Sequence, residues 1–133
     1  MALYSGSLDA NVLLRLLLND EPKQHAAAEA LFAKNTRLFA VADITLMQLI
    51  FALENHYKFS REAVAEAIAG LTLLPQIDCN KALLEHALPS YIANANLSFE
   101  DCCLTAYAKM KNAEPLWTFD KDLAAKAANV ELA

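Results

Sequence analysis

The chain has little glycine and little proline, and these shortages exclude several classes of protein. Its 133 residues include two glycines and four prolines, and they contain no Ser/Gly-rich linker, low-complexity tract or repeat. Because Gly6 and Gly70 stand alone, the chain has no glycine-rich loop that could cradle the phosphates of a nucleotide cofactor. We therefore expect one compact domain spanning residues 1–133, and not a nucleotide-cofactor enzyme.

The sequence also lacks the marks of secreted and membrane proteins. No apolar run reaches the roughly 18 to 20 residues that span a bilayer, and the N-terminus lacks the basic and apolar regions of a signal peptide. Cys79, Cys102 and Cys103 are odd in number, and their spacing fits neither a zinc site nor a redox motif. We expect a cytoplasmic protein without a membrane partner, whose thiols are reduced and mostly buried.

Basic residues are outnumbered, with 11 Lys and Arg against 16 Asp and Glu and a formal net charge of −5. This balance argues against a general nucleic-acid coat, because non-specific affinity comes from cations that neutralise phosphates. It allows a nuclease, since a metal ion in an acidic pocket supplies local positive charge. Candidates for a basic rim that holds RNA are Arg15, Lys109, Lys111 and Lys121, and each is equally compatible with ordinary surface charge.

Hydrophobic residues form 56% of the chain, and they are arranged as short apolar runs that alternate with longer helix-like segments. Strands are predicted at 3–8, 38–42, 76–78, 116–119 and 130–132. Helices are predicted at 12–18, 22–35, 43–57, from 60 to 74, from 80 onward, 98–112 and 120–127. This alternation predicts an α/β fold, in which a parallel sheet is flanked by helices on both faces.

Several polar residues and prolines predict where helices begin and end. Asp43 and Ser60 are expected N-caps, and Ser98-Phe99-Glu100-Asp101 has the form of a capping box. Pro89 is expected to kink or split its helix. Trp117 and Phe119 are expected in the core, with stacking on an RNA base as the alternative.

Three aspartates lie where strand-like runs give way to helix-like runs, namely Asp9, Asp101 and Asp120. In parallel sheets, ligands bind at the carboxyl ends of the strands. Each aspartate alone is most simply a helix cap, but a buried group of carboxylates persists most easily when a cation neutralises it. Together they predict a site for Mg²⁺ or Mn²⁺ and metal-dependent phosphodiester chemistry.

The segments Leu8 to Arg15, Ser98 to Asp101 and Thr118 to Asp120 resemble the acidic motifs of PIN-domain ribonucleases. More narrowly, they resemble VapC-type toxins of bacterial toxin–antitoxin pairs, and the similarity extends over nearly the whole chain. The resemblance implies a three-layer α/β/α fold with a central parallel sheet of about five strands. It also implies an Mg²⁺- or Mn²⁺-dependent endoribonuclease with an RNA substrate and a cognate antitoxin protein.

Carried over by position, the resemblance implies that Asp9, Asp101 and Asp120 are the catalytic and metal-binding residues. Asn11 and Thr118 would support them through hydrogen bonds.

The sequence departs from the family at Gln48, where a glutamate is usual. The Gln48 carbonyl oxygen can still coordinate a metal ion, but the amide has no negative charge and cannot act as a base. Three readings remain: an active ribonuclease toxin, a weakened or inactive PIN-like module that binds RNA or protein, and a structural scaffold without metal. Alanine- and leucine-rich faces in excess of one small core also predict a symmetric homodimer.

Overall fold

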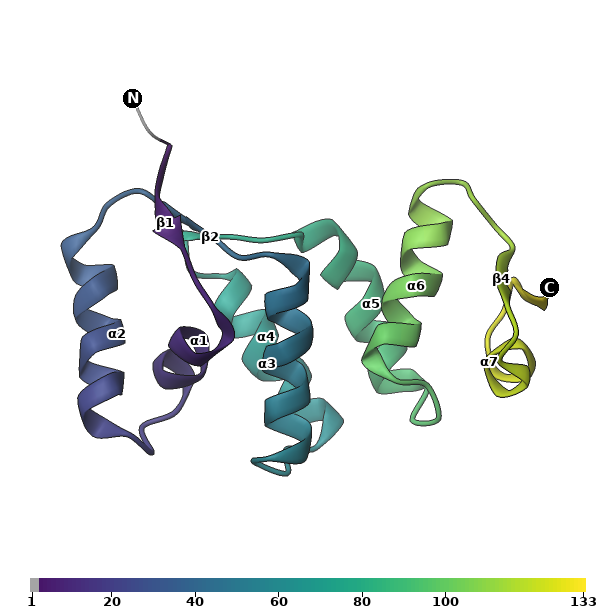
Figure 1. Cartoon of the computed structure of the whole chain (residues 1–133), viewed down its shortest axis with the longest axis horizontal. Helices are drawn as coiled ribbons and strands as arrows, with labels where there is room; N and C mark the ends of the chain where they lie inside the picture. The colour runs from purple at the N-terminus through teal and green to yellow at the C-terminus, as the bar shows by residue number, and fades with distance from the viewer. Residues whose placement is uncertain (1–2) are drawn as a thin grey trace. The chain divides into compact units, whose positions relative to one another are not determined.

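The computed structural model describes residues 3–133, which form two compact units, one ending at Asn80 and one running from Lys81 to Ala133 (Figure 1). The first unit contains β1 (Tyr4–Ser7), α1 (Ala10–Leu17), α2 (Pro22–Lys34), β2 (Leu38–Ala40), α3 (Asp43–Asn55), α4 (Arg61–Thr72) and β3 (Ile77–Asp78). The second contains α5 (Lys81–Ala93), α6 (Phe99–Met110), β4 (Leu116–Thr118), α7 (Lys121–Lys126) and β5 (Val130–Leu132). A single domain over residues 1–133 stays a prediction.

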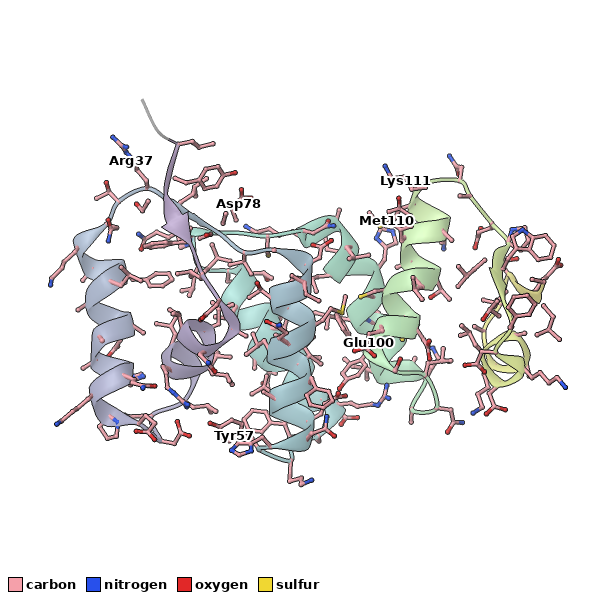
Figure 2. All side chains as sticks on the ribbon, in the orientation of Figure 1. Arg37, Tyr57, Asp78, Glu100, Met110 and Lys111 are labelled. Carbon is pink, nitrogen blue, oxygen red and sulfur yellow. The ribbon has the colours of Figure 1, made fainter. Side chains whose placement is uncertain are left out.

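The first unit is built on a three-stranded parallel sheet with the order β1-β2-β3. Its register pairs Ser7 with Ala40 and Ala40 with Asp78, so the carboxyl ends of the three strands lie at one edge. The side chain of Tyr4 donates a hydrogen bond to Asp78 Oδ2 at 2.5 Å, which raises the pKa of Tyr4. Asp78 is labelled at the end of β3 in Figure 2.

In the second unit, α5 and α6 pack together, and β4 and β5 form a two-stranded parallel sheet connected through α7. The rings of Tyr91 and Phe99 meet edge to face, with centroids 5.6 Å apart, and both side chains are buried. The α/β fold with parallel strands flanked by helices is therefore confirmed, and five strands are present. They form a three-stranded sheet in the first unit and a two-stranded sheet in the second, instead of the single sheet predicted, because the ladder hydrogen bonds of β4 go to β5.

The helix starts confirm most of the predicted caps. Ser60 caps α4 by accepting a hydrogen bond from the backbone of Ala63, and Ser98 forms the predicted capping box at the start of α6. Asp43 is not an N-cap, and that prediction is wrong. Ala42 takes the cap position, and the Asp43 carboxylate accepts a hydrogen bond from Asn80 Nδ2 at 3.3 Å instead. Pro89 lies inside α5, which continues past it without splitting.

Burial differs from the prediction at two aromatic residues. Trp117 is 61% exposed and Phe119 is 85% exposed, so neither lies in the core. Side chains alternate between the two faces of a strand, so Trp117 and Phe119 lie on the same face. Both faces of this segment carry apolar residues, and the sequence therefore does not determine which face is buried. Cys102 and Cys103 are buried as expected, and Cys79 is half-buried. No helix among residues 3–133 combines the length and apolar character needed to cross a bilayer.

Candidate functional site

Asp9 is held at the junction between β1 and α1. Leu8, the residue before it, is buried, and its backbone N–H donates to the carbonyl oxygen of Ala40 in β2 at 3.0 Å. Asp9 itself is the exposed N-cap of α1, where Oδ1 accepts a hydrogen bond from the backbone N–H of Val12 at 3.1 Å. Within residues 3–133, Asp9 Oδ2 accepts no hydrogen bond.

Asp101 is positioned by the capping box of α6. Ser98 Oγ accepts a hydrogen bond from the Asp101 backbone N–H at 3.0 Å, and Asp101 Oδ2 accepts one from the Ser98 N–H at 3.3 Å. The residue is half-buried, and its Oδ1 has no hydrogen-bond partner in the part of the chain that the structure describes.

Asp120 is the N-cap of α7 and follows directly from the end of β4 and Phe119. Its Oδ1 accepts hydrogen bonds from the backbone N–H groups of Asp122 and Leu123, at 2.9 and 3.1 Å. Thr118 Oγ1 accepts a hydrogen bond from the Asp120 backbone N–H at 3.0 Å, so Thr118 holds the main chain and not the carboxylate. Asp120 Oδ2 has no partner among the described residues.

The three aspartates thus share one arrangement, in which one carboxylate oxygen stabilises a helix start and the other is unbonded. One aspartate side chain could therefore cap a helix with one oxygen and bind a metal ion with the other. Hard carboxylate oxygens fit Mg²⁺ or Mn²⁺. Asp9 belongs to the first unit and Asp101 and Asp120 to the second. Among residues 3–133, no group of three His, Cys, Asp or Glu side chains that could hold a metal ion is present.

Asn11 and Gln48, the predicted amides of the site, are both exposed in the first unit. Asn11 is the second residue of α1, two positions after Asp9. Gln48 lies on α3, between the exposed side chains of Ile44 and Phe51. Among residues 3–133, neither amide side chain forms a hydrogen bond, so both are available to a ligand.

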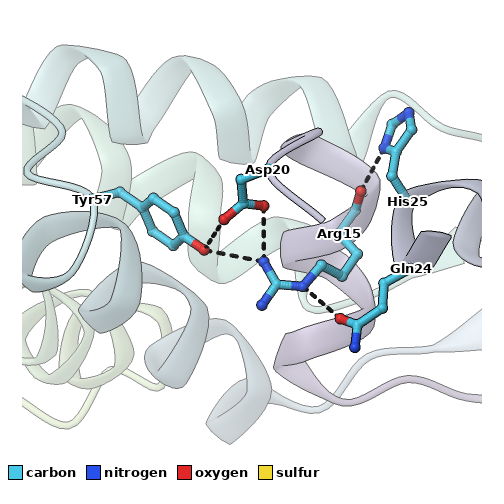
Figure 3. A network of polar contacts seen from close by, with 5 residues as sticks. All are labelled: Arg15, Asp20, Gln24, His25 and Tyr57. Atoms are coloured by element: carbon cyan, nitrogen blue, oxygen red, sulfur yellow. Dashed lines mark hydrogen bonds and ion pairs between the residues drawn. The ribbon is translucent and has the colours of Figure 1, made fainter. Parts of the chain in front are cut away.

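Arg15, a predicted RNA-rim residue, is engaged by its own unit (Figure 3). Its Nη1 donates to Asp20 Oδ1 at 2.9 Å and to the Tyr57 hydroxyl at 3.0 Å, and its Nε donates to Gln24 Oε1 at 2.8 Å. The Tyr57 hydroxyl in turn donates to Asp20 Oδ2 at 2.7 Å. The hydrogen bond from Tyr57, aided by the charge of Arg15, lowers the pKa of Asp20. The hydrogen bond to Tyr57 also raises the pKa of Arg15.

No local pattern in the sequence predicts this network, because Arg15 and Tyr57 are 42 positions apart. The other predicted rim residues behave differently. Lys109 and Lys121 are exposed, and neither forms an ion pair within residues 3–133. Lys109 also lines a cavity of about 430 Å³ in the second unit, together with Lys126. Lys111 is labelled at the end of α6 in Figure 2, and its Nζ lies 5.9 Å from the ring centroid of Tyr107.

A groove is lined by residues of α1 and α2 and by Asp9. Its volume is about 370 Å³. Asp9, the N-cap of α1, lines it together with Asn11 of α1, while Gln24, Ala27, Ala28 and Leu31 line it from α2. A candidate metal-binding carboxylate therefore opens directly onto a pocket within its own unit.

Comparison with known proteins places these features in a family. The sequence matches the PIN domain over residues 7–129. Among solved structures, the chain is similar to the crystal structure of VapC20 from Mycobacterium tuberculosis, described as a toxin that cleaves the sarcin–ricin loop. The identity is 18% and the TM-score 0.44, with 91% of this chain and 94% of that chain covered. No curated protein matches the sequence significantly.

Proposed function

The chain belongs to the PIN domain family, and we propose that it is a metal-dependent endoribonuclease that acts as the toxin of a toxin–antitoxin pair. One observation carries the proposal. In each of Asp9, Asp101 and Asp120, one carboxylate oxygen accepts a hydrogen bond at a helix start and the other accepts none within residues 3–133. Three carboxylates prepared in this way suit a divalent cation better than three unrelated surface caps would.

In this proposal, Asp9, Asp101 and Asp120 hold Mg²⁺ or Mn²⁺. When bound, the ion supplies positive charge that polarises the scissile phosphate and favours deprotonation of a nearby water. The hydrogen bonds from Val12, Ser98 and Leu123 restrict rotation of the three carboxylates, which lowers the entropy cost of holding a ligand.

The supporting residues have separate roles. Thr118 keeps the backbone of Asp120 in place. Asn11 and Gln48 offer neutral oxygens, and the exposed Lys109 and Lys121 offer charge to the RNA backbone. Arg15 is proposed to stiffen the first unit, because its guanidinium is already bonded to Asp20, Gln24 and Tyr57.

A second candidate function is a weakened or inactive PIN-like module that binds RNA or protein. The observation that favours it is Gln48, which leaves the acidic group with one negative charge fewer than a glutamate would supply. Metal affinity should fall accordingly, and a base at this position is absent.

Incubation of structured RNA with the full chain and Mn²⁺ separates the two functions. The ribonuclease predicts cleavage by the unmodified chain that disappears in Asp9→Asn. The weakened module predicts cleavage only after Gln48→Glu. If Gln48→Glu and the unmodified chain both leave the RNA intact while both bind it, the catalytic proposal is wrong and binding is the function.

The proposed partners follow from charge and exposure. An antitoxin would bring basic side chains to the unpaired carboxylates, because complementary charge favours association. A second copy of the chain would cover exposed apolar side chains such as Ile44 and Phe51 on α3, which are 64% and 63% exposed. The binding of a candidate antitoxin should weaken in Asp9→Asn and as the salt concentration rises.

A further inference from the structure

We propose that the groove between α1 and α2 binds one nucleobase of the RNA substrate, beside the phosphate handled at Asp9. The proposal rests on the proposed function, because it names a substrate subsite that opens from the same carboxylate. The groove lies wholly within the first unit, and its volume of about 370 Å³ lies within the range of small-molecule sites.

The apolar part of the groove's lining, called the floor below, suits the flat face of a base. Val12 contributes from α1, and Ala27, Ala28 and Leu31 contribute from α2. The two neighbouring alanines keep the surface low, so a planar group can lie against it without moving a longer side chain. Apolar burial of the base face favours binding, because it removes that surface from water.

The polar side chains that line the groove can hydrogen-bond to the edge of a base. A guanidinium only donates hydrogen bonds, so the Gln24 atom that faces Arg15 Nε must be the carbonyl oxygen. Figure 3 shows the Gln24 amide nitrogen turned away from Arg15, which leaves its N–H groups as donors in a known orientation. Asn11 adds an exposed amide with both a donor and an acceptor.

The Arg15 network makes the orientation of Gln24 rigid. Arg15 is itself held by Asp20 and Tyr57, so the guanidinium cannot turn away without breaking two further hydrogen bonds. Recognition of a base edge needs such a preorganised donor, because an adaptable side chain pays entropy on binding.

Charge decides that the neutral base, and not a phosphate, occupies the groove. The positive charge of Arg15 is balanced by Asp20 at 2.9 Å. Asp9, which also lines the groove, adds a negative charge without an ion-pair partner among residues 3–133, so a phosphate inside the groove would be repelled. A base is uncharged, and its sugar can leave the phosphate outside, where a metal ion at Asp9 would offset the repulsion.

The test is a titration of the full chain, with Mg²⁺ present, with each of the four nucleoside 5′-monophosphates and with ribose 5-phosphate. Methyl NMR signals of Ala27, Ala28 and Leu31 report on the floor. At least one nucleotide should shift these signals, while ribose 5-phosphate should leave them unchanged. Equal shifts with ribose 5-phosphate, or no shifts with any nucleotide at millimolar concentration, would overturn the proposal.

Matched variants locate the binding. Ala27→Leu fills the floor and should weaken nucleotide binding at least about tenfold, as added methylenes do in a hydrophobic pocket. Ala26→Leu makes the same change at an exposed position of α2 outside the groove and should bind as the unmodified chain does. Gln24→Glu keeps an acceptor for Arg15 but loses the amide donor, and should alter the order of affinity among the four bases.

These results can be separated from those of the catalytic proposal. Loss of binding in Ala27→Leu supports the base subsite even if no variant cleaves RNA. Metal-dependent cleavage with equal nucleotide binding by Ala27→Leu and Ala26→Leu would support the ribonuclease and overturn the subsite. If Ala27→Leu weakens binding of a partner protein and leaves nucleotide binding intact, the groove serves a protein and the subsite is wrong.

Discussion

Ser98 and Asp101 cap the first turn of α6 reciprocally, through hydrogen bonds of 3.0 and 3.3 Å between the side chain of each and the backbone N–H of the other. The same contact that starts the helix also holds one oxygen of a candidate metal ligand. We therefore expect stability and metal binding to be linked at this pair, and they can be separated by choosing which half of the contact is removed.

Ser98→Ala removes the hydroxyl half of the capping box. We expect the free energy of unfolding to fall by about 1 kcal/mol, as for other lost N-caps. Mn²⁺ affinity should also fall, because Asp101 loses part of its positioning. Ser60→Ala is the matched control, since Ser60 caps α4 in the same way without contacting any of the three aspartates. Urea unfolding and calorimetric Mn²⁺ titration measure the two effects. Equal Mn²⁺ affinity in the two variants contradicts a positioning role for Ser98.

Asp9→Asn separates the cap from the ligand. Asparagine is as good an N-cap as aspartate, so stability without metal should change by no more than about 0.5 kcal/mol. Saturating Mn²⁺ at about 100 times the dissociation constant should stabilise the unmodified chain by about 3 kcal/mol, and this gain should vanish in the variant. Asp9→Ala should lose both the cap and the gain.

Thermal unfolding with Mn²⁺ and with EDTA provides the measurement for Asp9, and the same pair of variants can be made at Asp120. If Mn²⁺ fails to stabilise the unmodified chain and Gln48→Glu alike, the metal-free scaffold is favoured.

Gln48→Glu introduces the negative charge that the resemblance to PIN-domain ribonucleases implies at this position. We expect Mn²⁺ affinity to rise by about tenfold, which corresponds to about 1.4 kcal/mol from one additional carboxylate. Asn55→Asp is the control, because it adds the same charge at the C-terminal end of α3, away from Gln48 in the middle of the helix. Calorimetric titration of both variants distinguishes a local ligand from a general charge effect. A similar rise in both variants would show that Gln48 is not part of the metal site.

Tyr57→Phe tests the Arg15 network through pH. The pKa of Asp20 is lowered chiefly by the hydrogen bond from Tyr57. The folded state therefore holds this proton less tightly than the unfolded chain, whose Asp pKa is about 3.9. The contribution to stability is present above about pH 4 and is lost as the pH falls through the folded-state pKa.

In Tyr57→Phe, the pKa of Asp20 should move up toward its ordinary value, and the loss of stability on acidification should become smaller. Carboxyl NMR titration and acid unfolding measure these two changes. Tyr107→Phe removes an exposed hydroxyl on α6 and should leave both unchanged. An Asp20 pKa that is unaffected by Tyr57→Phe would place its cause elsewhere.

Ile44 and Phe51 test the predicted homodimer. They lie seven positions apart on α3, hence about two turns along one face, and both are largely exposed. Light scattering at micromolar concentration should give a dimer, and Phe51→Ser should shift it toward the monomer. Leu73→Ser alters an 81% exposed leucine after α4 and serves as the control. A monomer in the unmodified chain contradicts the prediction.

Much of the fold and of the candidate site could be predicted because the signals are local. A cap such as Ser60 or Asp120 accepts hydrogen bonds from backbone N–H groups two or three residues later in the sequence. Both partners of the contact are therefore visible in one short segment. The positions of Asp9 and Asp120 after strands were likewise visible from the change in apolar period. The N-cap prediction for Asp43 was wrong because the Asp43 carboxylate accepts a hydrogen bond from Asn80, which lies 37 positions away in the sequence.

The sequence alone determined the alternation of strands and helices and the places where aspartates meet helix starts, since backbone hydrogen bonding depends on near neighbours. Only the tertiary structure decided that Arg15 is bonded to Tyr57, that Trp117 and Phe119 are exposed, and that a groove opens beside Asp9. These features depend on which helix faces pack together, because burial and long-range hydrogen bonds are properties of the packed chain and not of any short segment.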